Sequence, residues 1–230
     1  MEIFLDTSKV EEIEKWLNQG IIDGVTTNPS ILLKDGSRDL KASAKKIASL
    51  IHPRPLSVEV CTNDLKEMLR QGREFSSWLD NIVVKIPVIN EYGTSCLGVV
   101  KELENSGIKV NCTACLSFGQ ALLAAKAGAS YISLFAGRIS DEGGDPADIV
   151  RKTKVWLDMW NYKSKIIVGS IRTIGDIQQT AAAGAHVLTI PPEFLSKLVD
   201  HKYTRFTVQQ FVNDGKKALE AEIELVKVAQ

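Results

Sequence analysis

The sequence predicts a (β/α)8 barrel, also called a TIM barrel, with an additional C-terminal helix. Short runs rich in β-forming residues recur at fairly even spacing, and amphipathic helical patterns lie between them. Such alternation is typical of α/β proteins with a parallel sheet. In addition, one face of several expected strands turns polar toward the carboxyl end, which is where barrel enzymes carry their chemistry.

The expected strands follow one another from the amino terminus, at 3–6, 24–28, 56–60, 81–88, 109–114, 131–136, 165–170 and 186–191. Helices are expected at 8–18, 65–78, 97–105, 118–127, 147–160 and 174–183, because apolar residues recur there at helical spacing. Several of these helices end in a glycine such as Gly107, Gly128 or Gly184, which readily adopts the left-handed conformation that ends a helix. A last helix is expected over about 206–230, with Phe211, Ala218, Ile223, Val226 and Val228 as possible contact residues.

An open, doubly wound sheet is the alternative to a closed barrel, and side-chain parity favours the barrel. In the fourth strand Ile82, Val84 and Ile86 share one face, whereas Lys85 lies on the other. The second, third, fifth and sixth strands likewise combine an apolar face with one that turns polar. An open sheet covered by helices on both faces would not place Glu, Lys, Asn and Thr at its centre.

Length and composition indicate one large domain over residues 1–230, with 44% hydrophobic residues. Twenty-eight basic and 28 acidic residues give no net charge, so no global field attracts nucleic acid or an anionic membrane. A local basic pocket for a small anion remains compatible with this balance. We expect a soluble, cytoplasmic protein, since neither a signal-peptide pattern nor a bilayer-length apolar stretch is present.

The four cysteines do not predict a disulfide framework in a chain of this length. Cys61, Cys112 and Cys115 fall in expected strands, where buried free thiols are common. Cys112 and Cys115 have the C-x-x-C spacing of metal and redox sites, but no second pair accompanies them. We therefore expect no metal site and no cofactor.

Lys85 is the most informative residue, because it interrupts an otherwise apolar strand. An isolated charge in a low-dielectric interior is so costly that a buried lysine usually gives up its proton, which makes the amine a nucleophile. Two other interpretations are open: the side chain reaches water from the strand end, or it forms one half of a structural ion pair.

In a barrel, polar residues near the carboxyl ends of the strands would form one ring with Lys85. The expected ring holds Asp6, Asn28, Glu59, Lys85, Asn111, Thr113, Ser133 and Phe135. An amine beside carboxylates is the minimum for carbonyl chemistry through an imine, in which the iminium accepts electrons from a breaking carbon–carbon bond. The alternative is a buried ion-pair network without catalytic function.

Two arginines near the same rim suggest a phosphate site. Arg172 follows the seventh strand, where Thr173 and Asp176 have the spacing of a capping box at the start of a helix. A helix N-terminus with a nearby guanidinium suits a phosphate dianion. Arg138, just after the sixth strand, could bind the same group, although either arginine could instead form a surface ion pair.

Taken together, these motifs resemble the transaldolase family, specifically its short single-barrel branch, which includes fructose-6-phosphate aldolase. The matching segments are FLDTS (4–8), GVTTNPS (24–30), VKIPV (84–88), NCT (111–113), QALLAAKAGA (120–129), SLFAGR (133–138) and SIR (170–172). No single segment is specific, but their combination and order are.

The resemblance implies a Schiff base on Lys85, with Asp6 deprotonating the sugar hydroxyl as the bond breaks. It further implies a catalytic water held by Glu59 and Thr113, and substrate hydroxyls positioned by Asn28 and Asn111. The remaining implied roles are substrate binding by Ser133 and Phe135 and phosphate binding by Arg138, Ser170 and Arg172.

Within this branch, transaldolases resemble this chain in pairing glutamate with phenylalanine, at Glu59 and Phe135, where the aldolases tend to carry glutamine and tyrosine. The segment 89–96 looks longer than in similar proteins, and we expect it to stand over the site. In relatives the C-terminal helix reaches a neighbouring subunit, which implies a homo-oligomer of five or ten subunits. A helix that closes its own barrel is the alternative.

The first functional hypothesis is a metal-independent transaldolase of the pentose phosphate pathway. It would move a dihydroxyacetone unit from sedoheptulose 7-phosphate or fructose 6-phosphate to an aldose phosphate. The second is a lyase of the same mechanism that releases free dihydroxyacetone. The third is a barrel that binds a sugar phosphate without turning it over. None of them involves nucleic acid or a membrane.

Overall fold

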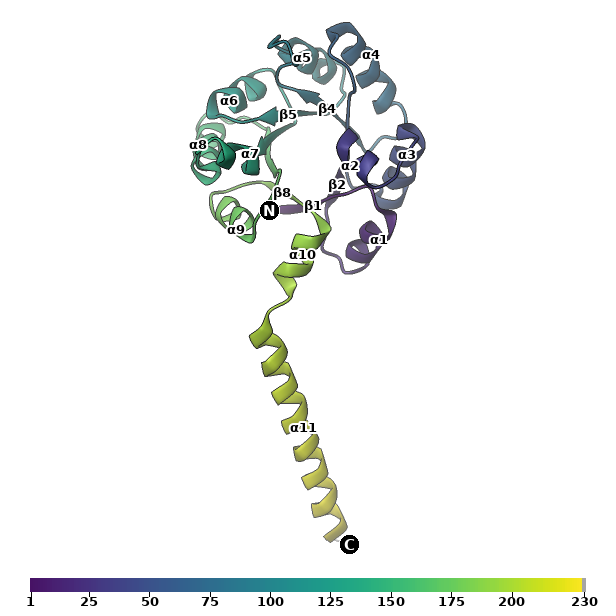
Figure 1. Ribbon diagram of the computed structural model, residues 1–230, viewed down its shortest axis with the longest axis vertical. Coiled ribbons are helices and arrows are strands. Elements are labelled where there is room, and N and C mark those ends of the chain that lie inside the picture. Colours follow the sequence, from purple (N-terminus) through teal and green to yellow (C-terminus); the bar gives the residue numbers. More distant parts are fainter. Residues whose placement is uncertain (229–230) are drawn as a thin grey trace. The chain divides into compact units, whose positions relative to one another are not determined.

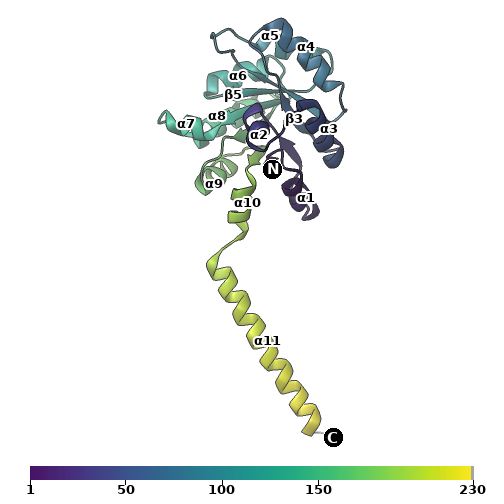
Figure 2. The ribbon, with the colours of Figure 1, turned by 45° about the vertical axis from the view of Figure 1, so that its right-hand side comes forward.

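A computed structural model describes residues 1–228 of the chain. Within them, eight parallel strands close into a barrel in chain order, and β8 pairs with β1. Figure 1 shows the strands around the centre and helices outside them, and Figure 2 shows the same barrel turned by 45°. The predicted barrel with a C-terminal helix is confirmed, and an open sheet is excluded because the closed ladder has no edge strands.

The strands are β1 (Glu2–Asp6), β2 (Gly24–Thr26), β3 (Leu56–Glu59), β4 (Ile82–Pro87), β5 (Val110–Cys115), β6 (Tyr131–Phe135), β7 (Lys165–Gly169) and β8 (Val187–Ile190). The helices are α1 (Val10–Asn18), α2 (Pro29–Lys34), α3 (Leu40–Ile51), α4 (Leu65–Ser76), α5 (Leu97–Asn105), α6 (Phe118–Lys126), α7 (Ala136–Asp141), α8 (Pro146–Met159), α9 (Ile174–Ala182), α10 (Pro192–Val199) and α11 (Lys202–Val228).

Strand register brings the polar residues of the predicted ring side by side. Glu59 of β3 pairs with Lys85 of β4, and Lys85 pairs in turn with Asn111 of β5. Asp6 of β1 pairs with Thr26 of β2. Because paired residues of neighbouring strands point to the same side of a sheet, these side chains all face the barrel interior. Residues Ile82 to Ile86 of β4 are all buried, some against the helices and some inside the barrel.

Helices α2, α3, α7 and α10 have no counterpart among the predicted helices. The sequence does carry a signal for α3: the Asp39 carboxylate accepts a hydrogen bond from the Ala42 N–H at 3.0 Å and caps the helix. Its buried residues Ala44, Ile47, Ala48 and Ile51 also follow helical spacing. By contrast, α2 and α7 have six residues each, too few for periodicity to be recognised.

The chain divides into two compact units, Met1–Pro192 and Glu193–Gln230. The first unit holds the barrel, and α11 of the second begins at Lys202, earlier than the predicted start near residue 206. The predicted contact residues Phe211, Ala218 and Ile223 are exposed, whereas the side chains of Val226 and Val228 lie outside those that are described. Over residues 1–228, no helix combines the length and the apolar character needed to cross a bilayer.

Candidate active site

A cavity of about 450 Å³ opens at the carboxyl ends of the strands. Its walls include most of the predicted site residues: Asp6, Asn28, Glu59, Lys85, Asn111, Ser133, Phe135, Arg138 and Ser170. Thr113 and Arg172 do not line it. The lining also contains five residues that are not among the predicted site residues, Thr26, Pro29, Ser30, Gly169 and Thr189. The barrel therefore gathers residues from most of its strands into one polar chamber.

Lys85 is buried in the wall of this cavity, with 5% of its surface exposed, so the interpretation in which it reaches water is wrong. Its Nζ lies 3.0 Å from Oε2 of Glu59 and donates to the Thr27 carbonyl oxygen at 3.0 Å. The buried amine thus lies beside a carboxylate, as the predicted polar ring implies, because register places Glu59 directly beside Lys85. Glu59 can accept a proton from Nζ at this distance.

Asn111 is held in one orientation by its neighbours. The Ser133 hydroxyl donates to Asn111 Oδ1 at 2.7 Å, and Asn111 Nδ2 points to the Ser57 hydroxyl at 3.4 Å. Asn28 has a second function, because its Oδ1 accepts from the Ile31 N–H at 2.9 Å and caps α2. Its amide nitrogen is then the group suited to bind a substrate hydroxyl.

Thr113 is fully buried beside the cavity rather than in its wall. The next residue, Ala114, has a left-handed φ of 58°, and the pairing of β5 with β6 shifts register here. This bulge alters the direction of the end of β5. Among the described residues, Thr113 Oγ1 has no hydrogen-bond partner, which suits an ordered water at this point.

The rim between β6 and β7 places Arg138 and Ser170 in the cavity wall, whereas Arg172 lies against Gly137 and does not line the cavity. The Gly137 N–H donates to the Ser170 carbonyl oxygen at 2.9 Å, and a Cβ on Gly137 would lie 2.5 Å from that oxygen. Only glycine permits this approach. Arg138 is exposed and lines the cavity.

Arg172 forms an exposed ion pair with Asp141 of α7, as the surface ion-pair interpretation predicts. The predicted capping box is present, with the Thr173 hydroxyl accepting from Asp176 N–H at 3.0 Å. However, the Asp176 carboxylate already accepts from the N–H groups of Arg172 and Thr173, at 2.9 Å each. A phosphate bound here would therefore depend on side-chain donors more than on these two amides.

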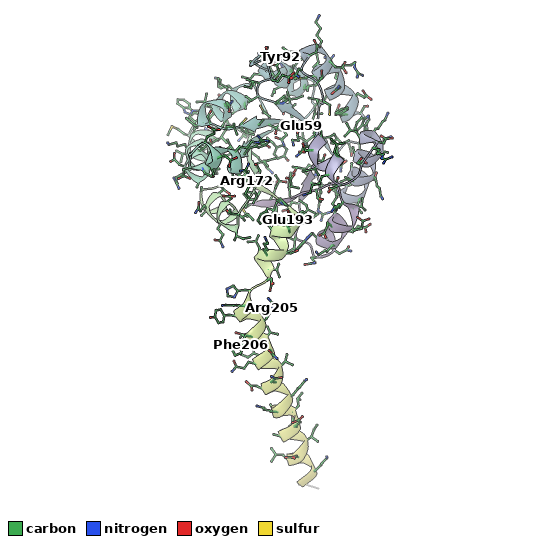
Figure 3. The ribbon with its side chains drawn as sticks, viewed as in Figure 1. Glu59, Tyr92, Arg172, Glu193, Arg205 and Phe206 are labelled. Carbon is green, nitrogen blue, oxygen red and sulfur yellow. The ribbon has the colours of Figure 1, made fainter. Side chains whose placement is uncertain are left out.

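The segment 89–96 contributes no residue to the cavity wall, contrary to the expectation that it stands over the site. Asn90 organises the segment internally, accepting from the N–H groups of Tyr92 at 3.1 Å and Thr94 at 2.9 Å. Its Nδ2 donates to the Asn63 carbonyl oxygen at 3.0 Å, which ties the segment to the loop after β3. In Figure 3, Tyr92 lies toward the outer edge of the barrel, whereas Glu59 lies nearer its centre.

The cysteines are all free thiols. Cys112 and Cys115 are buried in β5, but Cys61 is exposed beyond the end of β3, so its predicted place inside a strand is wrong. A hydrogen bond with Cys115, together with burial, raises the pKa of Cys112 well above its usual value. A thiol of this kind is a poor nucleophile. Over residues 1–228, no group of three or more His, Cys, Asp or Glu side chains is arranged to bind a metal ion.

Comparison with known proteins adds a family match over almost the whole chain. The family model described as Transaldolase/Fructose-6-phosphate aldolase matches residues 3–230. A probable transaldolase of Carboxydothermus hydrogenoformans is 42% identical over 214 residues, covering 93% of this chain and 97% of the relative. A probable transaldolase of Bartonella henselae is 37% identical over 217 residues, covering 94% and 97% respectively.

Two solved structures are similar in fold. One is titled "Native KDPGal structure" and has a TM-score of 0.57 and 14% identity, covering 82% of this chain and 80% of the other. Thiamine phosphate pyrophosphorylase from Pyrococcus furiosus has the same TM-score and identity, covering 83% and 85%. At this identity the similarity establishes the barrel fold alone.

Proposed function

Because this chain belongs to the transaldolase/fructose-6-phosphate aldolase family, we propose that it is a transaldolase acting through a Schiff base on Lys85. It moves a dihydroxyacetone unit from sedoheptulose 7-phosphate or fructose 6-phosphate to an aldose phosphate, in the pentose phosphate pathway of the cytoplasm. The observation that carries the proposal is the buried Lys85 amine, 3.0 Å from the Glu59 carboxylate inside a polar cavity.

Imine formation begins when Nζ attacks the ketose carbonyl carbon. The ammonium must first lose a proton, and Glu59 is the neighbouring carboxylate that can take it. The carbinolamine then loses its hydroxyl as water, for which Glu59 returns a proton, and a protonated imine remains. A water held between Glu59 and the unpaired Thr113 hydroxyl would carry these protons, which accounts for a buried threonine just outside the cavity wall.

Bond cleavage requires a base, and Asp6 lines the same cavity as Lys85. Asp6 takes the proton from the hydroxyl on the far carbon of the breaking bond, and that oxygen forms the aldehyde of the departing aldose phosphate. The bonding electron pair moves into the iminium and gives an enamine on Lys85. The enamine then attacks the acceptor aldehyde, Asp6 returns its proton to the new hydroxyl, and hydrolysis of the imine releases the product ketose.

Substrate orientation follows from the polar wall. Asn28 and Asn111 bind hydroxyls near the reacting carbons, and Ser133 holds the Asn111 amide in place. Arg138 and Ser170 lie at the cavity wall where the phosphate would bind. Arg172 would have to exchange Asp141 for the phosphate, which is a small rearrangement because both side chains are about half exposed.

Transfer rather than release is favoured by Phe135, whose ring lines the cavity and carries no proton donor. We expect fructose 6-phosphate alone to yield little free dihydroxyacetone, whereas adding erythrose 4-phosphate yields sedoheptulose 7-phosphate rapidly. Phe135→Tyr is expected to raise the release of dihydroxyacetone about tenfold or more, because a hydroxyl here can protonate the enamine. Enzymatic product analysis with and without acceptor measures both.

Phe135→Leu is the matched control, since it changes the ring without adding a donor and should not increase release. Rapid release of dihydroxyacetone by the unmodified protein without an acceptor would instead support the lyase. Absence of a borohydride-trapped adduct on the Lys85 peptide would support a barrel that only binds sugar phosphates.

The protein is also proposed to be a homo-oligomer of five or ten subunits, assembled through α11. By itself this helix exposes an apolar stripe at helical spacing, formed by Val208, Phe211, Val212, Leu219 and Ile223. Phe206 also projects from α11 (Figure 3) and is 64% exposed, but it lies outside this stripe. Such a stripe on one helix is typical of a protein–protein contact.

Light scattering of the full chain tests the assembly. Phe211→Asp introduces a charge into the stripe and is expected to reduce the mass of the particle, because burying an unpaired carboxylate is unfavourable. Gln210→Asp, on the opposite face of the helix, should leave the mass unchanged. A monomeric mass for the unmodified protein would contradict the proposed oligomer.

A further inference from the structure

Two threonine hydroxyls lie behind Asp6, in strands that flank β1 on either side. Thr26 of β2 donates from Oγ1 to Oδ1 of Asp6 at 2.7 Å, and the same Oγ1 lies 2.5 Å from Oγ1 of Thr189 in β8. Both threonines line the cavity but are almost fully buried, with 2% and 5% of their surfaces exposed. Figure 1 shows β8, β1 and β2 as neighbours in the barrel wall.

The hydrogen atoms of these two hydroxyl groups can be arranged in only one way when Asp6 is ionised. A carboxylate accepts hydrogen bonds but cannot donate, so the one hydroxyl hydrogen of Thr26 points to Asp6. Thr26 Oγ1 can then only accept from Thr189, which must be the donor in the second contact. Two successive hydroxyl donors thus point toward the carboxylate and polarise each other in a dry environment.

Thr189 is held in place by a glycine on the neighbouring strand. A Cβ built on Gly169 of β7 would lie 3.1 Å from Cγ2 of Thr189, which is tighter than ordinary van der Waals contact. The absence of a side chain at Gly169 therefore leaves the space in which Thr189 can turn its hydroxyl toward Thr26. The arrangement involves four adjacent strands, β7, β8, β1 and β2.

We propose that Thr189 and Thr26 form a hydroxyl relay that positions Asp6 as the base of carbon–carbon bond cleavage. The inference rests on the proposed function, in which Asp6 takes and later returns a substrate proton. The relay fixes the rotamer of the carboxylate, since a hydrogen bond to an ionised acceptor is about twice as strong as one to a neutral acceptor. Thr189 acts only through Thr26 and is a positioning residue.

The relay acts on Asp6, whereas imine formation uses the neighbouring pair Lys85 and Glu59. Glu59, Lys85 and Arg138 are the other charged side chains in the cavity wall, and Glu59 is paired with Lys85. The two threonine hydroxyls bond to Asp6 and to each other, and Lys85 Nζ donates to the Thr27 carbonyl oxygen. Changes to the relay should therefore affect cleavage without preventing imine formation.

Valine and serine substitutions separate the hydroxyl from the methyl group at each position. Thr26→Val is expected to lower kcat about 10- to 100-fold, the range for loss of a hydrogen bond to a charged group. Thr189→Val should lower kcat about 3- to 10-fold, while Thr26→Ser and Thr189→Ser stay within about 3-fold of the unmodified protein. In every variant, borohydride with fructose 6-phosphate should still trap an adduct on Lys85.

Two combinations test the order of the relay. The double variant Thr26→Val/Thr189→Val should be no slower than Thr26→Val alone. Without the Thr26 hydroxyl, Thr189 is no longer connected to Asp6 by hydrogen bonds, so its replacement has no further effect on kcat. Gly169→Ala should displace the Thr189 methyl and lower kcat, and Thr189→Ser, which lacks that methyl, should restore it in the Gly169→Ala background. A merely structural role for these residues would not produce this rescue.

The outcomes distinguish the relay from the function on which it rests. If the unmodified protein gives no Lys85 adduct, the Schiff-base proposal and the relay both fail. If the adduct forms but the valine variants keep full kcat, or the two losses multiply in the double variant, the relay alone is overturned. Graded losses with serine rescue and an unchanged adduct support it.

Discussion

Lys85→Met is expected to abolish both the borohydride-trapped adduct and turnover, with a loss of at least about 10⁴-fold in kcat. Methionine has a similar length but no amine, so no imine can form and the entire covalent route is lost. The assays are peptide mass mapping after borohydride treatment and the transfer of dihydroxyacetone from fructose 6-phosphate to erythrose 4-phosphate.

The fold of Lys85→Met should persist, because methionine suits an otherwise apolar strand. Removing one partner of a fully buried ion pair costs about 3–5 kcal/mol. Here the Glu59 side chain keeps 22% of its surface exposed and can be hydrated from the cavity, so we expect a change in unfolding free energy below about 2 kcal/mol. Urea denaturation measures it. Unfolding of the variant would indicate a structural lysine.

Lys109→Met is the matched control for Lys85→Met. Lys109 is exposed immediately before β5, at the opposite end of the barrel from the cavity. Its replacement should leave adduct formation and kcat unchanged. If Lys109→Met lost activity to the same extent, the loss in Lys85→Met could not be assigned to the amine.

Asp6→Asn has the second largest expected effect and separates the two halves of the mechanism. The asparagine oxygen can still accept the hydrogen bond from Thr26, so the side chain keeps its position, but it cannot take a proton from the substrate. We expect kcat to fall about 10²- to 10⁴-fold, the contribution typical of a general base. The Lys85 adduct should still be trapped by borohydride.

Asp80→Asn provides the control, because the Asp80 side chain is 80% exposed and pairs with His52 away from the cavity. That variant should retain full activity. An Asp6→Asn protein that neither forms adduct nor turns over would place Asp6 in imine formation instead. Full activity in Asp6→Asn would remove it from the mechanism, and with it the role proposed for the threonine relay.

The polar ring was largely predictable from local sequence. Side chains alternate between the two faces of any strand, so Lys85 could be placed on the opposite face from Ile86 without knowing the neighbouring strands. The same reasoning assigned Asp6, Glu59, Asn111 and Ser133 to one interior face, and all four line the cavity. Their catalytic roles remain predictions.

Other features were missed because their signals are weak or shared with other structures. The helical spacing of α3 was present in the sequence but unused. Thr26 and Thr189 were not assigned to the site, although strand parity placed Thr26 on the same face as Asn28, since a threonine in a strand is ordinary. Gly169 leaves space for Thr189, but in the sequence it indicates only the end of a strand.

The sequence by itself determined the alternation of strands and helices and the face on which each polar side chain lies, because both depend on short-range backbone geometry. Only the tertiary structure decided which side chains meet. Glu59 pairs with Lys85, Thr26 meets Thr189, and Arg172 contacts Asp141. These contacts depend on register and on barrel closure between segments as much as 163 positions apart, which no local pattern specifies.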